Sequence, residues 1–156
     1  MLTPSMAKKA ESKRLVFGAP DVDNVLSQMS SEEVEQLPVG VIKIDAKGKI
    51  LIYNAAEGAL AGLSPRDVIG RNFFRDIAPC TNRPEFLGRF VDGVKSGNLD
   101  VIFEYRFFFN RIPTRVTVQM RRSYHDQSFW ILIQERSDIS ANEAEISEMD
   151  PSKKIW

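Results

Sequence analysis

Residues 69–86 read I-G-R-N-F-F-R-D-I-A-P-C-T-N-R-P-E-F and contain Cys80, the one cysteine of the chain. Proline fixes its own φ and restricts the residue before it, so Pro79 and Pro84 predict a stiff, non-helical loop that presents Cys80 in a defined direction. A lone thiol cannot form an internal disulfide. Cysteine is among the most buried residue types, so the residue type alone favours a small apolar filler over a chemical group.

A second motif lies upstream, where residues 53–58 read Y-N-A-A-E-G. If this segment leads into a helical layer, the side chains of Tyr53 and Glu57 can point into one pocket. Burial would keep the Glu57 carboxyl neutral by raising its pKa, and a neutral carboxyl donates a hydrogen bond as a phenol does. The pair would then be two donors for a phenolate or an enolate. The alternative, in which Tyr53 ends a strand and Glu57 is solvated, stays open because Glu is rarely buried without a partner.

Helical spacing marks the segments on either side of these motifs. Before Pro38 it predicts two short helices, the first with Val22, Val25, Leu26 and Met29 on one face and the second with a capping box of Ser30 and Glu33. Residues 39–53 read as a β-hairpin with its turn at 45–48, and short helices follow residues 54 and 64. After the Cys80 loop an amphipathic helix is expected, ended by Gly97, with its apolar stripe at Phe86, Leu87, Phe90, Val91 and Val94.

Three strands are predicted in the last third of the chain. The first places Val101, Phe103, Tyr105, Phe107 and Phe109 on one face and Phe108 on the other. The second places Val116, Val118 and Met120 together on one face. In the third, Phe129, Ile131 and Ile133 alternate with Trp130 and Leu132, so both faces are apolar. An antiparallel sheet normally leaves one face to water, so we expect the N-terminal helices to cover the outer face.

This order of elements predicts an α+β fold, a five-stranded antiparallel sheet with helices on one face and an N-terminal helical cap on the other. We expect a mobile N-terminal tail over residues 1–14, the helical cap over 15–38, the core over 39–136 and an acidic tail over 137–156. The cap and the core of this 156-residue chain are expected to form one domain.

Composition excludes several classes of protein. Lys and Arg number 21, as do Asp and Glu, so no global field favours nucleic acid or a membrane surface. No apolar run is long enough for a transmembrane helix, and the N-terminus lacks the apolar segment of a signal peptide. The simplest expected location is the cytoplasm.

Other chemistries of Cys80 find little support. A cysteine hydrolase needs a base, usually His, and the only histidine, His125, falls in a predicted turn between late strands. No cluster of Cys and His has the spacing of a zinc site.

Arg115, Arg121 and Arg122 are too few for a nucleic-acid-binding stripe and read as a solvated face.

Several short motifs in the same order resemble the photoactive yellow protein family, small blue-light sensors with the PAS fold. They are residues 53–58 (YNAAEG), 68–70 (VIG), 72–74 (NFF), 78–81 (APCT), 84–86 (PEF), 96–99 (SGNL) and 103–105 (FEY). The similarity runs from about Val16 to Glu135, and the two tails fall outside it.

The resemblance implies a chromophore and its site. Cys80 would carry p-coumaric acid (4-hydroxycinnamic acid) as a covalent thioester, and Tyr53 and Glu57 would hold its phenolate end. Blue light would isomerise the chromophore from trans to cis, Glu57 would give up a proton, and the N-terminal cap would loosen as the signal. The pocket would be lined by Ile42, Ala61, Leu63, Phe73, Ile77, Ala78, Pro79, Thr81, Phe107, Phe109 and Arg111.

Four positions of this pocket depart from the family pattern. The family usually has threonine at Ala61, arginine at Leu63, tyrosine at Phe109 and methionine at Arg111. The methionine position is tied to return from the light state, and Arg111 can supply a cation from the other side of the pocket. We therefore expect an altered colour and an altered recovery rate.

Two functions of different classes follow. The first is a covalent-chromophore photoreceptor, which is not an enzyme, acting on an unidentified downstream signalling protein. The second is a PAS interaction or ligand-binding module without light sensing. The chain is expected to bind neither nucleic acid nor membrane and to be a monomer, with a weak dimer as the alternative.

Overall fold

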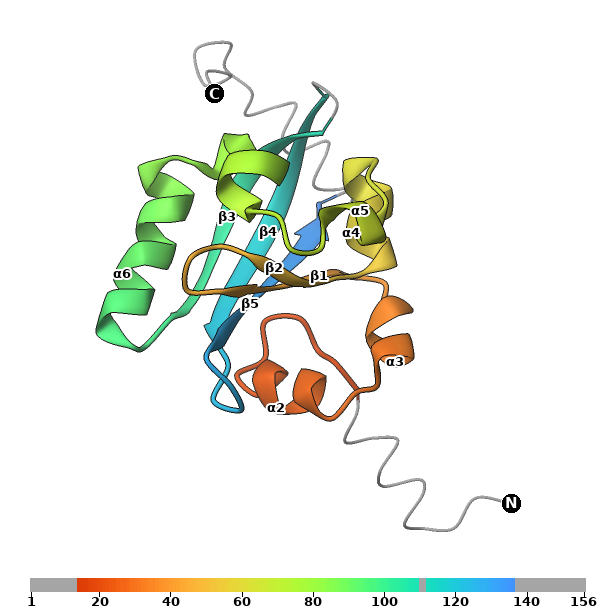
Figure 1. Cartoon of the computed structure of the whole chain (residues 1–156), viewed down its shortest axis with the longest axis vertical. Helices are drawn as coiled ribbons and strands as arrows, with labels where there is room; N and C mark the ends of the chain where they lie inside the picture. Colours follow the sequence, from red (N-terminus) through yellow and green to blue (C-terminus); the bar gives the residue numbers. More distant parts are fainter. Residues whose placement is uncertain (1–13, 110–111, 137–156) are drawn as a thin grey trace.

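The computed structural model describes residues 14–109 and 112–136, and within them five strands form one antiparallel sheet (Figure 1). The order across the sheet is β2-β1-β5-β4-β3, so the N-terminal hairpin and the late three-stranded meander meet where β1 pairs with β5. The strands are β1 (Gly40–Asp45), β2 (Ile50–Tyr53), β3 (Asp100–Phe109), β4 (Ile112–Arg122) and β5 (Ser128–Glu135). The predicted five-stranded antiparallel sheet is confirmed.

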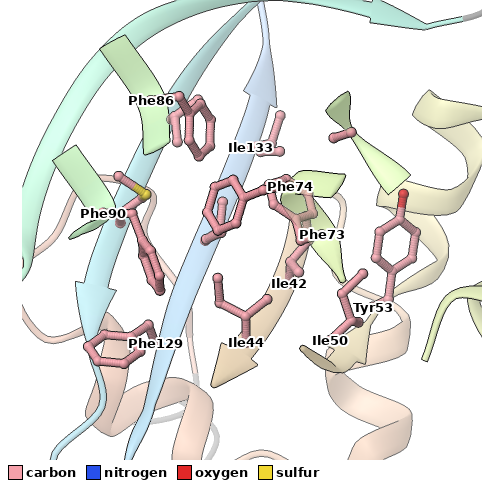
Figure 2. Close-up of a cluster of buried hydrophobic side chains, with 14 of the residues drawn as sticks. Ile42, Ile44, Ile50, Tyr53, Phe73, Phe74, Phe86, Phe90, Phe129 and Ile133 are labelled. Atoms are coloured by element: carbon pink, nitrogen blue, oxygen red, sulfur yellow. The ribbon is translucent and has the colours of Figure 1, made fainter. Parts of the chain in front are cut away.

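The helical layer between β2 and β3 packs on the inner face of the sheet. Its elements are α4 (Ala55–Ala61), α5 (Pro65–Val68), the π-helical segment η1 (Phe73–Ile77), the 3₁₀ turn η2 (Pro79–Thr81), the π-helical segment η3 (Pro84–Gly88) and α6 (Arg89–Ser96). Apolar side chains of this layer and of the inner strand faces form the main core. Figure 2 shows part of this core, including the rings of Phe73, Phe74, Phe86 and Phe90 and isoleucines of β1, β2 and β5.

The N-terminal cap covers the outer face of the sheet, as expected from β5. The cap contains α2 (Val22–Ser27) and α3 (Ser31–Glu35), and the predicted capping box of Ser30 and Glu33 begins α3. Trp130 and Leu132 on the outer face of β5 form a second core with Val22, Leu26 and Val34 of the cap. Burial of these two side chains is why the alternation in β5 is apolar on both faces.

Two buried polar side chains fasten the cap to the sheet. The Gln119 side chain on β4 accepts a hydrogen bond from the Gly18 backbone N–H (2.8 Å) and donates one to the Ala19 carbonyl (3.0 Å). The Trp130 indole N–H donates to the Asp23 carboxylate at 2.9 Å. The partners in these bonds are 100 or more residues apart in sequence. Local sequence patterns therefore could not predict them.

The segment around Cys80 corrects two predictions. Cys80 lies in the 3₁₀ turn η2 and not in a non-helical loop, because Pro79 takes the first position of that turn, where its missing N–H has no helical partner to lose. The amphipathic helix α6 begins only at Arg89, after the π-helical segment that holds Phe86, and Val91 is exposed. Gly97 ends α6 with φ of 72°, as predicted.

Three parts of the predictions lie outside the described residues: the N-terminal tail up to residue 13, the acidic tail over 137–156, and Arg111. The division into tails, cap and core therefore stays a prediction. Within the described ranges, no helix has the length and apolar character needed to cross a bilayer.

Candidate functional site

A cavity of about 280 Å³ lies between the helical layer and the inner face of the sheet. It brings Tyr53 of β2, Glu57 of α4 and Cys80 of η2 to one chamber. Its lining residues are Tyr53, Glu57, Ala61, Leu63, Phe73, Ile77, Ala78, Pro79, Cys80, Phe107, Phe108 and Phe109. All of these except Phe108 were predicted from the sequence, so residues far apart in the chain meet as the resemblance implies.

Two of the predicted pocket residues lie elsewhere. Ile42 is fully buried in the main core beside the cavity and does not line it. Thr81 is also fully buried, and its hydroxyl donates to the Ala78 carbonyl at 2.6 Å, which closes the turn that carries Cys80. The lining residue that the sequence missed is Phe108, which alternation assigns to the outer face. Its backbone N–H hydrogen-bonds to Cys80, since β3 is an edge strand and presents main-chain groups there.

Cys80 is half-buried, and its backbone position is fixed by Tyr105. The Tyr105 hydroxyl on β3 donates a hydrogen bond of 2.6 Å to the Cys80 carbonyl. Burial raises the pKa of the Cys80 thiol, and the hydrogen bonds from backbone N–H groups oppose that rise only in part. The thiol is therefore mostly protonated at pH 7, so Cys80 is not held as a resting thiolate nucleophile.

Glu57 is the one buried carboxyl of the cavity. It lies in the first turn of α4, is 1% exposed, and its Oε1 atom has no hydrogen-bond partner. Burial raises its pKa from the ordinary 4.5 to about 8, so the side chain is protonated at pH 7. A protonated carboxyl can donate a hydrogen bond into the cavity.

Tyr53 ends β2 and is also buried. Burial raises the pKa of its phenol, and the neighbouring Glu57 carboxylate raises it further. Tyr53 therefore keeps its proton over the whole physiological range. The site thus holds two neutral donors and no cation of its own among the described lining residues, which favours a single anionic oxygen as their acceptor.

Asn54, between Tyr53 and α4, connects this site to the cap. Its side-chain oxygen caps α4 by accepting from the Glu57 N–H (3.1 Å) and also accepts from the Val41 N–H (2.9 Å). Its amide donates to the carbonyls of Val34 and Val39, both at 3.0 Å. The sequence signal was an Asn before a helix, which predicts a cap but not the bond to α3.

Aromatic rings and small apolar groups make up the rest of the wall. The rings of Phe107 and Phe109 are 5.1 Å apart between centroids, and Phe86 packs behind Phe107 at 5.9 Å. Two of the departures from the family pattern, Ala61 and Leu63, add no polar atom, and Leu63 is 39% exposed at the cavity edge. Such a wall suits a flat aromatic ligand.

His125 does not lie near Cys80. It occupies the β4–β5 turn, with Nε2 at 3.0 Å from Asn24 Oδ1, and it is absent from the cavity lining. No group of metal-ligating side chains occurs in the described part of the chain. The hydrolase hypothesis therefore has no histidine base among the described residues that line the cavity.

Comparison with known proteins agrees with this geometry. The family model for the PAS fold matches residues 28–136. The photoactive yellow protein of Halochromatium salexigens is 49% identical over 117 residues, which cover 75% of this chain and 94% of that protein. The chain belongs to the photoactive yellow protein family. Its members are photoreceptors and not enzymes, so the resemblance seen in the sequence is confirmed.

More distant relatives agree with this assignment. The photoactive yellow protein of Cereibacter sphaeroides is 38% identical over the same length. The crystal structure of the photoactive yellow protein domain from the sensor histidine kinase Ppr of Rhodospirillum centenum superposes with a TM-score of 0.69 at 44% identity, covering 72% of this chain and 98% of that one. A PAS domain of an HTR-like protein from Haloarcula marismortui, at 20% identity and a TM-score of 0.53, shares the fold alone.

Proposed function

We propose that this photoreceptor holds p-coumaric acid as a thioester on Cys80 and responds to blue light. The observation that carries the proposal is the cavity itself, which joins a half-buried thiol to two buried neutral donors across an apolar chamber. Its volume of about 280 Å³ is near the lower end of small-molecule pockets, which run from about 300 to 1,000 Å³.

The residues present fit such a group. The Glu57 carboxyl lines the cavity and, being protonated, needs an acceptor for its hydrogen bond. A phenolate oxygen would accept from both Tyr53 and the protonated Glu57. The apolar wall of Phe73, Phe107 and Phe109 would exclude water from the ring. Once bound, the chromophore supplies the absorption of blue light and a trans-to-cis isomerisation.

Glu57 is the residue that converts this event into a change of the fold. In the dark its carboxyl holds a proton, since burial places its pKa at about 8. If the carboxyl gives that proton to the bound phenolate oxygen, a charged group stands in a site where Oε1 has no partner. A buried unpaired charge costs several kcal/mol, which is a large part of the stability of an ordinary domain.

The cap is the part of the molecule positioned to respond. Asn54 bonds the first turn of α4, which carries Glu57, to the carbonyl of Val34 in α3. A shift of that turn therefore acts directly on the cap, which packs on Trp130 and Leu132 and is fastened by Gln119. Loosening of the cap would expose this outer face to a downstream signalling protein. The presence of a similar domain in the sensor histidine kinase Ppr supports a partner of the signalling class.

One observation favours a second function, a PAS module without light sensing. Ala61 and Leu63 remove two polar groups that the family usually places around the chromophore, and the mouth at Leu63 is open and apolar. A PAS module that binds an apolar ligand or a partner without light sensing would tolerate both changes.

A visible spectrum separates the two functions. The apoprotein is mixed with activated p-coumaric acid, and Cys80→Ala serves as the control. The photoreceptor predicts a long-wavelength band in the native chain alone, which blue light bleaches and darkness restores. A folded protein with a free thiol and no band would leave the interaction module as the better account.

A further inference from the structure

A separate hollow of about 330 Å³ is lined by Gly40 and by Ala56, the residue before Glu57. It forms where the start of β1, α4 and the end of β5 meet, and we call it the vestibule. Its lining residues are Pro38, Val39, Gly40, Ala56, Leu60, Ile133, Gln134 and Glu135. None of them lines the chromophore cavity.

Gly40 lines the vestibule and also lies against the Glu57 carboxyl. A Cβ atom at Gly40 would overlap Glu57 Oε1 and would come within 3.2 Å of the Ile133 carbonyl oxygen. The absence of a side chain at Gly40 therefore lets the carboxyl lie against the main chain of β1. Any other residue there would displace the carboxyl from this position.

The chemistry of the vestibule suits water. The exposed side chains of Gln134 and Glu135 are at its rim. A buried water needs two to four polar partners and space of about 10–15 Å³, and the vestibule offers both. The Oε1 atom that faces Gly40 is the one polar side-chain atom of the described residues that is buried without a partner.

We propose that the vestibule is the route by which Glu57 exchanges its proton with solvent. The inference rests on the proposed function, because a chromophore in the cavity would occupy the other approach to this carboxyl. In the exchange the O–H bond of the Glu57 carboxyl breaks, its proton passes to the oxygen of a water molecule in the vestibule, and that water passes a proton to bulk solvent. Reloading of Glu57 reverses these steps.

Hydrogen–deuterium exchange at Glu57 tests the route. The chromophore-loaded chain is diluted into D₂O in the dark, and the infrared carbonyl band of the protonated carboxyl is followed as it shifts. The band is assigned by its loss in Glu57→Gln. This readout needs no illumination, so it does not depend on photocycle activity.

Filling the vestibule should slow this exchange. Ala56→Leu adds volume to its wall, so exchange then requires local opening, and we expect it to slow about tenfold, which corresponds to about 1.4 kcal/mol. Ala59→Leu is the matched control, because Ala59 is exposed on the same helix and lines neither hollow. It should exchange at the native rate.

Widening the vestibule gives a second variant with the opposite sign. Leu60→Ala removes wall volume and should speed exchange about threefold or more. Its control is Leu87→Ala, which loses similar packing against the same core away from the vestibule. The pair decides the matter if Ala56→Leu does not fold.

Three results would overturn the inference. If both vestibule variants exchange at the native rate, the vestibule is not the route. Leu63→Trp narrows the mouth of the chromophore cavity instead, and if it alone slows exchange, the proton leaves through that mouth. Equal acceleration by Leu60→Ala and Leu87→Ala would mean general loosening. The visible absorption band of the chromophore-loaded chain tests the proposed function separately. If the band is present together with any of these three results, only the vestibule route is wrong. If the band is absent, both the proposed function and the route are wrong.

Discussion

In the chain without a chromophore, the free energy of unfolding should fall steeply as pH rises, and replacing Glu57 with Gln should remove this fall. A group whose pKa is raised in the folded state stabilises that state below its unfolded pKa and loses the contribution as pH rises through the folded pKa. For Glu57 these limits are 4.5 and about 8. A glutamine side chain has the size of a glutamate but no proton to lose, so the difference between the two proteins isolates this one group.

The magnitude follows from the burial of the carboxyl. Each pKa unit is worth about 1.4 kcal/mol, so the full rise corresponds to about 5 kcal/mol. Between about pH 5 and pH 9 the free energy of unfolding of the native chain should fall by about 4 kcal/mol relative to Glu57→Gln. That is a large part of the roughly 5–15 kcal/mol typical of a domain, so the native chain should be sensitive to alkali.

Urea unfolding followed by tryptophan fluorescence at about five pH values measures this difference. Glu85→Gln is the control, since it makes the same substitution at an exposed position on η3, away from the cavity. If the native chain and Glu57→Gln run parallel within about 1 kcal/mol from about pH 5 to pH 9, Glu57 is ionised in the folded state and the reasoning fails.

Three further substitutions test the supports of the site. Gly40→Ala should destabilise the fold by about 1–3 kcal/mol in urea unfolding, because the new Cβ overlaps the Glu57 carboxyl. Asn54→Ala removes four hydrogen bonds from buried main-chain groups and the cap of α4, and should cost about 3–5 kcal/mol by the same assay. Gln119→Ala frees the segment at Gly18 and should cost about 1–2 kcal/mol and speed limited proteolysis before α2.

Matched changes elsewhere control for the type of substitution. Gly88→Ala should be nearly neutral, since its Cβ would meet only Pro84 Cβ at 3.8 Å. Asn72→Ala removes the cap of η1 and one solvent-exposed hydrogen bond from its amide to the Lys47 carbonyl, and should cost about 1 kcal/mol. Equal costs within either pair would contradict the tight packing at Gly40 or the buried network at Asn54. If Gln119→Ala is cleaved at the same rate as the native chain, Gln119 does not hold the cap on the sheet.

Much of the fold could be predicted from local patterns. Two-residue alternation identified the strands, and apolar residues on both faces of β5 predicted a covered outer face, which Trp130 and Leu132 confirm. The π-helical segments were missed because their spacing differs from the 3.6-residue period that the prediction uses, so Phe86 was assigned to the wrong kind of helix.

Most residues that line the cavity were predicted, but the contacts that support them were not. Alternation shows which face of a strand a residue occupies but not its place along that face, so Ile42 was taken for a lining residue. Phe108 reaches Cys80 through its backbone, which side-chain patterns do not report. The close approach of Gly40 to Glu57 joins two separate elements and depends on the packing of α4 against β1.

The infrared difference spectrum of the chromophore-loaded chain, light minus dark, tests the central claim about Glu57 most directly. We predict that blue light removes the carbonyl band of the protonated carboxyl and adds a carboxylate band, and that both changes disappear in Glu57→Gln. A native chain whose visible band bleaches while the Glu57 carbonyl band keeps its intensity would contradict the account.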